Sequence, residues 1–452
     1  MKLNRYTILI LTVFLLQSCG DFLDERPQKS LVVPSTLEDL QAILDDYDNL
    51  VNDPTYGEIS ADDYYLTNDN WKSLPEEGHR RAYMWEKDYL FGTGTATDWL
   101  NVYRNVYAAN TVLEKLDDTP IEDRNSLQWN GIKGQALFLR ASSFLSIANI
   151  WTVGYEQNAA KEQLGIPLRM ESDFNIPSTR SSLAETYAVI IDDLKNAERL
   201  LPKTVVHPSR ASKPAALALL ARTYLFMGDY ERCWTAADAC MELKNDLMDY
   251  NDLTETATYP IPEFNREVIY VSRMTTPQPL RSNRAKVDST LYTLYDAEDR
   301  RKKVFFQDNG DGTVGFKGSY MGNITLFSGL ATDEVYLMRA ECSARKGDID
   351  GALDDLNTLL KSRWDNGFDF EPLIIPDDED LLQTILLERR KELLMRGIRW
   401  ADIKRLNLEG RNIVLKRNIN DQTIELPPND LRYALPIPEQ ILNLSNMEQN
   451  PR

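Results

Sequence analysis

The chain has 452 residues, with 51 Lys or Arg against 70 Asp or Glu, so its formal net charge at pH 7 is −19. A protein this acidic repels phosphate backbones and anionic lipid surfaces, which argues against nucleic-acid binding. With 42% hydrophobic residues, a chain of this length can bury a large core in one domain or in two intergrown lobes.

The first residues form an export signal. Lys2 and Arg5 precede the apolar run 6–16, which is shorter than the roughly 20 residues that a membrane-spanning helix needs. The run ends in Leu-Gln-Ser-Cys at residues 16–19, which resembles a bacterial lipobox. We therefore predict a signal peptide over 1–18 and lipidation of Cys19, where several acyl chains would contribute about 0.8 kcal/mol per buried methylene. An ordinary cleaved signal with a chance cysteine is the alternative.

Three long helices are predicted from the spacing of apolar residues, over 98–116, 132–151 and 182–201. Asp98 is expected to cap the first of them. Ser182 and Glu185 form a capping-box pattern at the start of the third, and Pro202 ends it.

Two further segments share one design, a helix, a Gly-Asp turn and a returning helix. The turns are at Gly228-Asp229 and Gly347-Asp348. Small residues fall where the paired helices must approach closely, at Ala221, Cys233, Ala340 and Ala352. This pattern resembles the tetratricopeptide unit. Two generic helical hairpins are the alternative.

Irregular segments interrupt the helices over 52–97 and 250–330. The sequence predicts a strand over 267–274 and a hairpin over 304–316 whose turn is Asn309–Gly312. The predicted fold class is therefore mostly α, with helical hairpins supporting a loop-rich lobe that holds a few short strands.

No catalytic, cofactor or metal-binding motif is evident. The chain has two histidines, His79 and His207, and neither stands beside a nucleophile motif. Apart from Cys19 there are three cysteines, Cys233, Cys240 and Cys342, an odd number that excludes a complete disulfide framework. A glycosidase carboxylate pair is compatible with so acidic a chain, but no pair stands out. We therefore predict no cofactor, no metal and no enzyme activity.

The densest charged cluster lies over 388–405. Its members are spaced three and four residues apart, so they can pair with one another. We interpret the cluster as a structural network around Trp400, with a ligand site as the alternative. The members are Glu388, Arg389, Arg390, Glu392, Arg396, Arg399, Trp400, Asp402 and Arg405.

Several segments in order resemble the SusD/RagB-like outer-membrane nutrient-binding lipoproteins. The segments are SCGDFLDERP, WLNVYRNVYAAN, GQALFLRASSFLSIANIW, LLERRKELLMRGIRWADIKRLN and LPIPEQILNLSNMEQNP. The resemblance covers nearly all of the chain after residue 18. It implies one SusD-like domain over 19–452, with the loop-rich ligand lobe in about 19–330 and the ERRxEL…RW signature in about 331–452.

The resemblance also implies the role. It implies a lipid-anchored protein of the outer membrane that faces the cell exterior, captures a nutrient, most often an oligosaccharide, and passes it to a SusC-like TonB-dependent transporter. A peptide or another non-sugar nutrient is one alternative, and a surface glycoside hydrolase is another.

Sugar binding favours aromatic rings beside polar side chains in exposed loops, because a pyranose offers an apolar C–H face and a rim of hydroxyls. In the family, the loops that match 62–85 and 290–330 here tend to border the ligand face. The candidate ligand-binding residues are Asp62, Asp63, Tyr64, Tyr65, Trp71, Arg80, Trp85 and Tyr320.

Overall fold

The computed structural model of the protein describes residues 34–91, 97–118, 123–375 and 377–452. The predicted signal peptide over 1–18 and Cys19 lie outside these ranges. About 48% of the described residues are helical, and the strands among them are few and short, which confirms the predicted fold class. Among the described residues, no helix is both long and apolar enough to cross a membrane.

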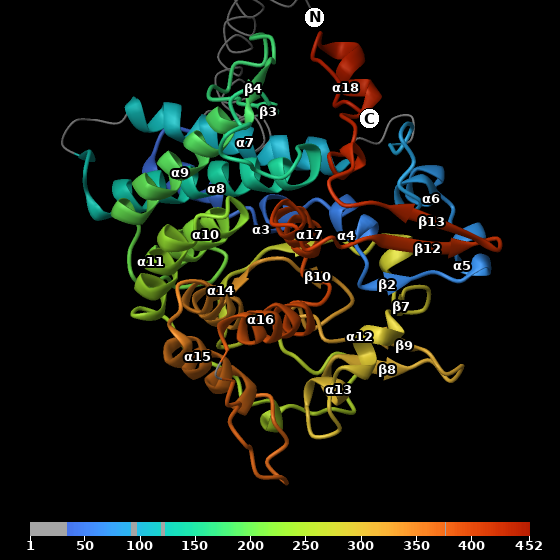
Figure 1. Cartoon of the computed structure of the whole chain (residues 1–452). Helices are drawn as coiled ribbons and strands as arrows, with labels where there is room; N and C mark the ends of the chain where they lie inside the picture. Colours follow the sequence, from blue (N-terminus) through green and yellow to red (C-terminus); the bar gives the residue numbers. More distant parts are fainter. Residues whose placement is uncertain (1–33, 92–96, 119–122, 376) are drawn as a thin grey trace, which may run out of the picture.

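The three predicted long helices are confirmed and lie together in the upper half of Figure 1. They are α7 (Thr97–Asp117), α8 (Leu127–Trp151) and α9 (Leu183–Leu200). The capping box is also present: the Ser182 hydroxyl accepts a hydrogen bond from the Glu185 N–H at 3.1 Å, and the Glu185 carboxylate accepts one from the Ser182 N–H at 2.8 Å. The short helix α2 (Leu37–Leu44) covers one end of this layer through Leu40.

Asp98 caps a different helix from the one predicted. Its carboxylate accepts hydrogen bonds from the N–H groups of Thr55 at 2.5 Å and Tyr56 at 3.2 Å. It therefore serves the start of α4 (Tyr56–Ser60), while α7 begins one residue before Asp98. Burial raises the pKa of Asp98 to about 6. The prediction was wrong because the side chain reaches a segment more than forty residues away.

Both predicted hairpins are present. The first is α10 (Lys213–Phe226) with α11 (Tyr230–Met241), and the second is α14 (Thr332–Arg345) with α15 (Ile349–Lys361). Gly228 and Gly347 adopt φ values of +72° and +80° in the turns, a conformation that glycine adopts without strain. Helix α11 packs on α14, so the chain leaves the helical layer after the first hairpin and returns to it with the second.

The loop-rich lobe is built from the segments that leave the layer. The predicted hairpin over 304–316 is confirmed, whereas the predicted strand over 267–274 is divided into β5 and β6, which pair with different strands. The strands of the lobe are β1 (Asn52–Asp53), β2 (Tyr64–Tyr65), β5 (Val268–Tyr270), β6 (Arg273–Met274), β7 (Lys286–Val287), β8 (Phe306–Asp308), β9 (Val314–Phe316), β10 (Leu326–Phe327) and β11 (Leu330–Ala331).

The C-terminal part connects the helical layer to the lobe. The remaining elements are α3 (Tyr47–Leu50), α5 (Asn68–Lys72), α6 (Glu77–Tyr83), β3 (Leu164–Pro167), β4 (Arg180–Ser182), α12 (Ser289–Thr293), α13 (Arg301–Val304), α16 (Asp378–Glu392), α17 (Arg399–Leu408), β12 (Leu415–Ile419), β13 (Gln422–Leu426) and α18 (Glu439–Leu444), with short 3₁₀ turns at Tyr250–Asp252, Gln278–Leu280 and Leu431–Tyr433.

The charged cluster over 388–405 has the predicted structural role, but most of its members pair with residues outside the cluster. Arg389 binds Asp402 at 2.9 Å, and Arg405 binds Asp402 at 2.7 Å and Glu341 of α14 at 2.6 Å. Trp400 is buried, and its indole N–H donates to the Tyr433 carbonyl at 3.1 Å. The network locks α16 and α17 to the second hairpin.

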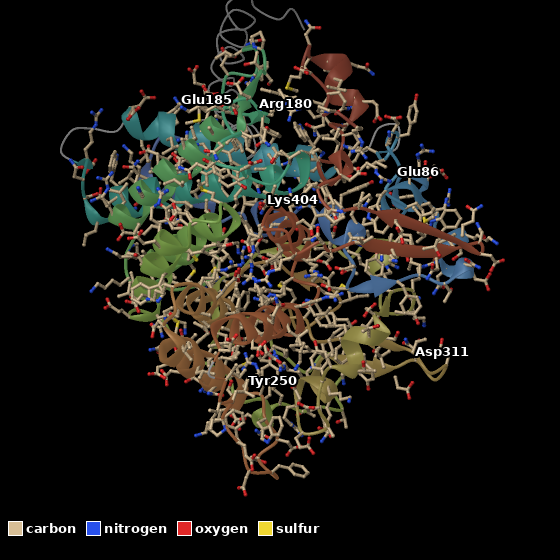
Figure 2. The ribbon with its side chains drawn as sticks, viewed as in Figure 1. Glu86, Arg180, Glu185, Tyr250, Asp311 and Lys404 are labelled. Carbon is tan, nitrogen blue, oxygen red and sulfur yellow. The ribbon has the colours of Figure 1, made fainter. Side chains whose placement is uncertain are left out.

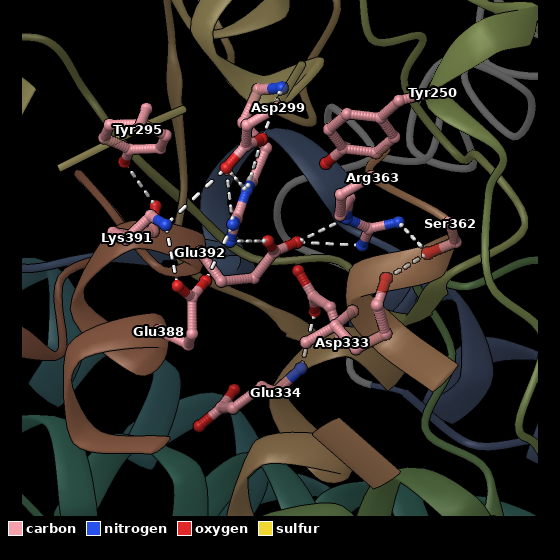
Figure 3. Close-up of polar contacts among 12 residues, drawn as sticks. Tyr250, Tyr295, Asp299, Asp333, Glu334, Ser362, Arg363, Glu388, Lys391 and Glu392 are labelled. Atoms are coloured by element: carbon pink, nitrogen blue, oxygen red, sulfur yellow. Dashed lines mark hydrogen bonds and ion pairs between the residues drawn. The ribbon is translucent and has the colours of Figure 1, made fainter. Parts of the chain in front are cut away.

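A second set of buried charges joins α16 to the lobe (Figure 3). Arg363 binds Glu267 at 2.9 Å and Glu392 at 2.8 Å. Arg301 binds Glu392 at 3.0 Å and also contacts Asp299 and Glu388 at 2.7 Å. All of these side chains are buried. Charges at such depth are stable only when each one keeps its partners.

With Lys391 and the Arg396–Asp333 pair included, this set has four positive and five negative side chains. The positive ones are Arg301, Arg363, Lys391 and Arg396, and the negative ones are Asp299, Glu267, Asp333, Glu388 and Glu392. Burial raises the pKa of Glu267 to about 7, against the lowering effect of Arg363, and Asp333 and Glu392 raise it further. The excess charge can therefore be relieved by a proton on Glu267.

Replacing Arg363 by Met should lower the free energy of unfolding by about 3–5 kcal/mol, because Glu267 and Glu392 would lose a buried partner. Urea denaturation monitored by circular dichroism measures this change in the free energy of unfolding. The matched control is Lys303→Met, since Lys303 is 45% exposed in its pair with Asp365, and its removal should cost at most about 1 kcal/mol. Equal losses in the two variants would contradict the structural role of Arg363.

The pH dependence of stability should report on Glu267. Because the folded state raises the pKa of this carboxyl from 4.5 to about 7, its contribution to stability is complete below pH 4.5 and is lost as the pH rises through 7. The Glu267→Gln variant should therefore lose less stability than the natural chain between pH 5 and pH 7.5. Thermal unfolding at both pH values tests this, and equal losses would show that Glu267 does not take up the proton.

Candidate ligand-binding surface

The two loop regions singled out in the sequence meet in the structure. Strand β2 pairs with β7 in an antiparallel register that places Tyr65 opposite Lys286. Beside this pair, the Asn70 side chain donates to the Arg284 carbonyl at 3.1 Å, and Lys286 lies 3.4 Å from Asp311 of the β8–β9 hairpin. Residues from 65–71 and 284–311 therefore form one continuous surface.

The base of this surface is held by the C-terminal helices. Asp62 binds Arg399 at 2.7 Å, and Asp63 binds Arg390 at 3.0 Å. Burial alone would raise the pKa of Asp62, but Arg399 and Arg390 outweigh it and hold that pKa below its usual value. The two carboxylates predicted to contact ligand are thus engaged with arginines, and they fix the position of β2.

Arg417 of β12 supports the same strand from the interior. Its guanidinium donates to the Tyr64 carbonyl at 2.7 Å and lies 4.1 Å from the centre of the Tyr83 ring. Backbone oxygens that β2 leaves unpaired in the interior are satisfied in this way.

Three of the candidate aromatic residues lie inside the protein. The Tyr64 hydroxyl donates to the Ile59 carbonyl at 2.9 Å, and the Trp85 indole N–H donates to the Ser60 carbonyl at 2.9 Å. Tyr320 is buried with its hydroxyl 2.5 Å from Glu267 and 3.0 Å from Asp333. Their polar atoms are satisfied internally and their rings are covered, so they have no ring face to offer a ligand in this structure.

Tyr65 and Trp71 remain partly exposed. The Trp71 indole N–H donates to the Arg80 carbonyl at 3.3 Å, which fixes the ring orientation. The Arg80 side chain itself binds Glu77 at 3.1 Å and the Leu74 carbonyl. We define the Tyr65–Trp71 surface as these two aromatic residues together with Arg284 and Asp311. Asp311 and Glu86 lie on the same side of the molecule in Figure 2.

The arrangement suits a ligand with an apolar face and a polar edge. Tyr65 and Trp71 offer rings for stacking, and the exposed Asp311 carboxylate offers a hydrogen-bond acceptor beside them. The Arg284 guanidinium borders the surface but already donates to the Asn70 carbonyl at 3.3 Å and to the Ser73 hydroxyl. Burial, together with the negative charge of Asp311, raises the pKa of the Tyr65 hydroxyl, which therefore stays protonated at neutral pH.

Tyr89 is one of several exposed aromatic residues that the sequence analysis did not select as candidates. Tyr89 is 68% exposed, adopts a φ of +57°, and has the Arg81 guanidinium 5.7 Å from its ring centre. No sequence signal separates it from Tyr83, which is buried six residues earlier.

A separate groove of about 510 Å³ runs along α7, beside the β3–β4 connection and α18. Its exposed apolar residues include Tyr107 at 52% and Phe174 at 81% exposure. The groove is the alternative place for a ligand. In the described part of the chain, no group of three or more His, Cys, Asp or Glu is arranged to hold a metal ion.

The helical-hairpin scaffold, joined to a loop-rich lobe through α16 and α17, is a fold that this chain shares with solved structures of the SusD superfamily. Two profiles of that family match this chain, one described as "Starch-binding associating with outer membrane" over residues 21–225 and one described as "SusD family" over residues 332–452. The chain belongs to the SusD/RagB family.

Individual relatives agree with this assignment. The chain is 23% identical to SusD-like protein P2 of Formosa agariphila, over the full length of both chains. Among solved structures, a putative sugar binding protein from Bacteroides vulgatus shares 22% identity with a TM-score of 0.74, covering 93% of this chain and 99% of that chain. A "Laminarin binding SusD-like protein" shares 18% identity with a TM-score of 0.66, covering 92% and 98%. These structures establish the shared fold.

Proposed function

We propose that the protein captures an oligosaccharide on the Tyr65–Trp71 surface and releases it chemically unchanged. The observation that carries the proposal is the pair of partly exposed rings. Tyr65 lies on a strand fixed by Arg390, Arg399 and Arg417. Trp71 lies on α5, which is held by hydrogen bonds in both directions between Asn70 and Arg284. A rigid aromatic surface loses little conformational entropy when it binds a ligand. The name of one fold neighbour, a laminarin-binding protein, adds support for a glucan or a related sugar chain.

The place of action follows from family membership and from the N-terminal sequence. We propose that a lipid on Cys19 anchors the protein in the outer membrane with its body facing the cell exterior. There it would pass the captured sugar to a SusC-like TonB-dependent transporter. The members of the family are carbohydrate-binding proteins, so we expect binding without bond cleavage.

Replacing Trp71 by Ala should weaken oligosaccharide binding about tenfold, or about 1.4 kcal/mol, because the ligand would lose a stacking face. Isothermal titration against a panel of neutral glycans measures this loss, and chromatography of the same mixtures should show no cleavage products. Released sugars would instead indicate a glycoside hydrolase, and binding of peptides alone would assign the non-sugar alternative.

Two variants serve as controls for this experiment. Trp234→Ala removes a partly buried tryptophan of α11 that packs beneath Lys346, and it should leave affinity unchanged. Tyr107→Ala removes the exposed ring of the groove along α7. A loss in the Tyr107 variant but not in the Trp71 variant would place the ligand in the groove and refute the proposed surface.

Replacing Cys19 by Ser should abolish acylation, because the hydroxyl cannot receive the lipid as the thiol does. The variant should then appear in the soluble fraction after cell lysis, whereas the natural protein should sediment with the outer membrane. The control is Cys240→Ser, at a buried position that is distant in sequence from the anchor. Membrane association of the Cys19 variant equal to that of the natural protein would refute the anchor.

A further inference from the structure

A pocket of about 280 Å³ lies away from the Tyr65–Trp71 surface, at the start of α10. It is open to solvent and is bordered by the segment 203–208 that precedes α10 and by the segment 264–269 that leads into β5. This volume is smaller than that of pockets for drug-sized ligands, which begin at about 300 Å³, so it suits a single ring. Its apolar walls are formed by Val205, Pro208, Leu243, Phe264 and Ile269.

Every charged residue that lines this pocket is basic. The three are Lys203, Lys244 and Arg266, in a chain with 70 acidic residues against 51 basic ones. Lys244 is already engaged, since its ammonium contacts Asp246 and the Arg266 carbonyl at 2.6 Å each. Lys203 and Arg266 are exposed and make no ion pair within 4 Å in the described part of the chain, although Arg266 is near enough to Asp246 to contribute to the lowered pKa of that carboxyl. The pocket therefore favours an anion in a protein that otherwise repels anions.

Phe264 is held in an unusual backbone conformation at the wall of the pocket. Its φ is +55°, which costs conformational energy in a bulky residue and is a recurrent feature of functional sites. The next residue fixes this conformation: the Asn265 side chain donates to the Pro262 carbonyl at 3.1 Å and accepts from the Glu267 N–H at 3.0 Å. The Phe264 ring meets His207 edge-on at 4.4 Å and is still 39% exposed.

The start of α10 adds a favourable field. Ser212 and Pro214 line the pocket, and the positive end of a helix dipole attracts anions. Its first donors are already used, because the Lys213 N–H bonds the Pro202 carbonyl at 2.8 Å and the Ala215 N–H bonds the Ser212 hydroxyl at 3.3 Å. The charged contacts must therefore come from Lys203 and Arg266.

We propose that this pocket binds one hexuronate unit, a sugar ring that bears a carboxylate. The ring stacks on Phe264 between the apolar walls, and the carboxylate is bound by Lys203 and Arg266. The choice of a sugar rests on the proposed function, whereas the requirement for an anion with a ring rests on the pocket itself. The protein would then hold acidic sugar chains at a second point, separate from the Tyr65–Trp71 surface.

Titration of the full-length mature protein with D-glucuronate and with D-glucose tests the proposal. Glucuronate should bind and glucose should not, and raising the salt concentration should weaken the binding of glucuronate because the charges are partly exposed. Lys203→Gln and Arg266→Gln should each weaken it about fivefold, as expected for the loss of one partly screened charge contact. Lys361→Gln, which removes an exposed lysine of α15, is the control and should have no effect.

Phe264→Asn tests the ring without straining the backbone, because asparagine tolerates positive φ. This variant should keep its melting temperature and lose affinity for glucuronate. The proposal is overturned if glucuronate does not bind, if glucose binds equally well, or if the Lys203, Arg266 and Phe264 variants all bind as the natural chain does.

The Trp71→Ala variant separates this proposal from the preceding one, since it should bind glucuronate with unchanged affinity. If neutral oligosaccharides fail to bind while glucuronate still does, only the Tyr65–Trp71 surface is refuted.

Discussion

The structure depends on buried charges that must all be paired at once. Arg301, Arg363 and Arg389 are each less than 3% exposed, and each is stable at that depth only because carboxylates from other elements reach it. Those carboxylates come from the lobe, from α14 and from α16 and α17. An ionic interior of this kind tolerates one arrangement of its elements, because any displacement would leave a charge without its partner.

The same helices also determine where the ligand surface lies. Along α16, Arg389 and Glu392 point into the ionic interior, while the neighbouring Arg390 reaches Asp63 immediately before β2. Lys404 of α17 donates to the carbonyls of Asn149 and Thr152 at the end of α8, at 2.7 and 2.9 Å. Helices α16 and α17 therefore connect the helical scaffold, the buried ion pairs and the aromatic surface to one another. These connections explain how short strands in long loops can keep a fixed geometry.

Local signals in the sequence predicted the scaffold well. Apolar periodicity predicted α7, α8 and α9, and the Ser182–Glu185 pair predicted a capping box. The Gly-Asp turns predicted both hairpins. The structural role of the cluster over 388–405 was also predicted, but helical spacing accounts only for the Asp402–Arg405 pair, because most of the other members bind residues far away in the chain.

The candidate site was harder to predict because its residues are sorted by distant contacts. Tyr64 and Tyr65 are adjacent and chemically identical, and strand geometry requires that they face opposite sides, but only the positions of Arg417 and β7 decide which of them is buried. Asp62 and Asp63 looked free for a ligand because their arginine partners lie more than 320 residues later. The basic pocket could not be predicted for the same reason, because Lys203 and Arg266 are far apart in the sequence.

The contacts of residues 62–65 with arginines of the C-terminal part affect the order in which the protein can fold. Residues 62–65 acquire their native contacts only when Arg390, Arg399 and Arg417 are present. Most of the chain must therefore be available before this strand is fixed. Contacts between residues so far apart in the sequence make folding slow. The aromatic residues of segment 62–65 therefore stay exposed until the C-terminal elements have packed against them. The hairpins, whose contacts are local, can form first and supply the template on which the two ends of the chain meet.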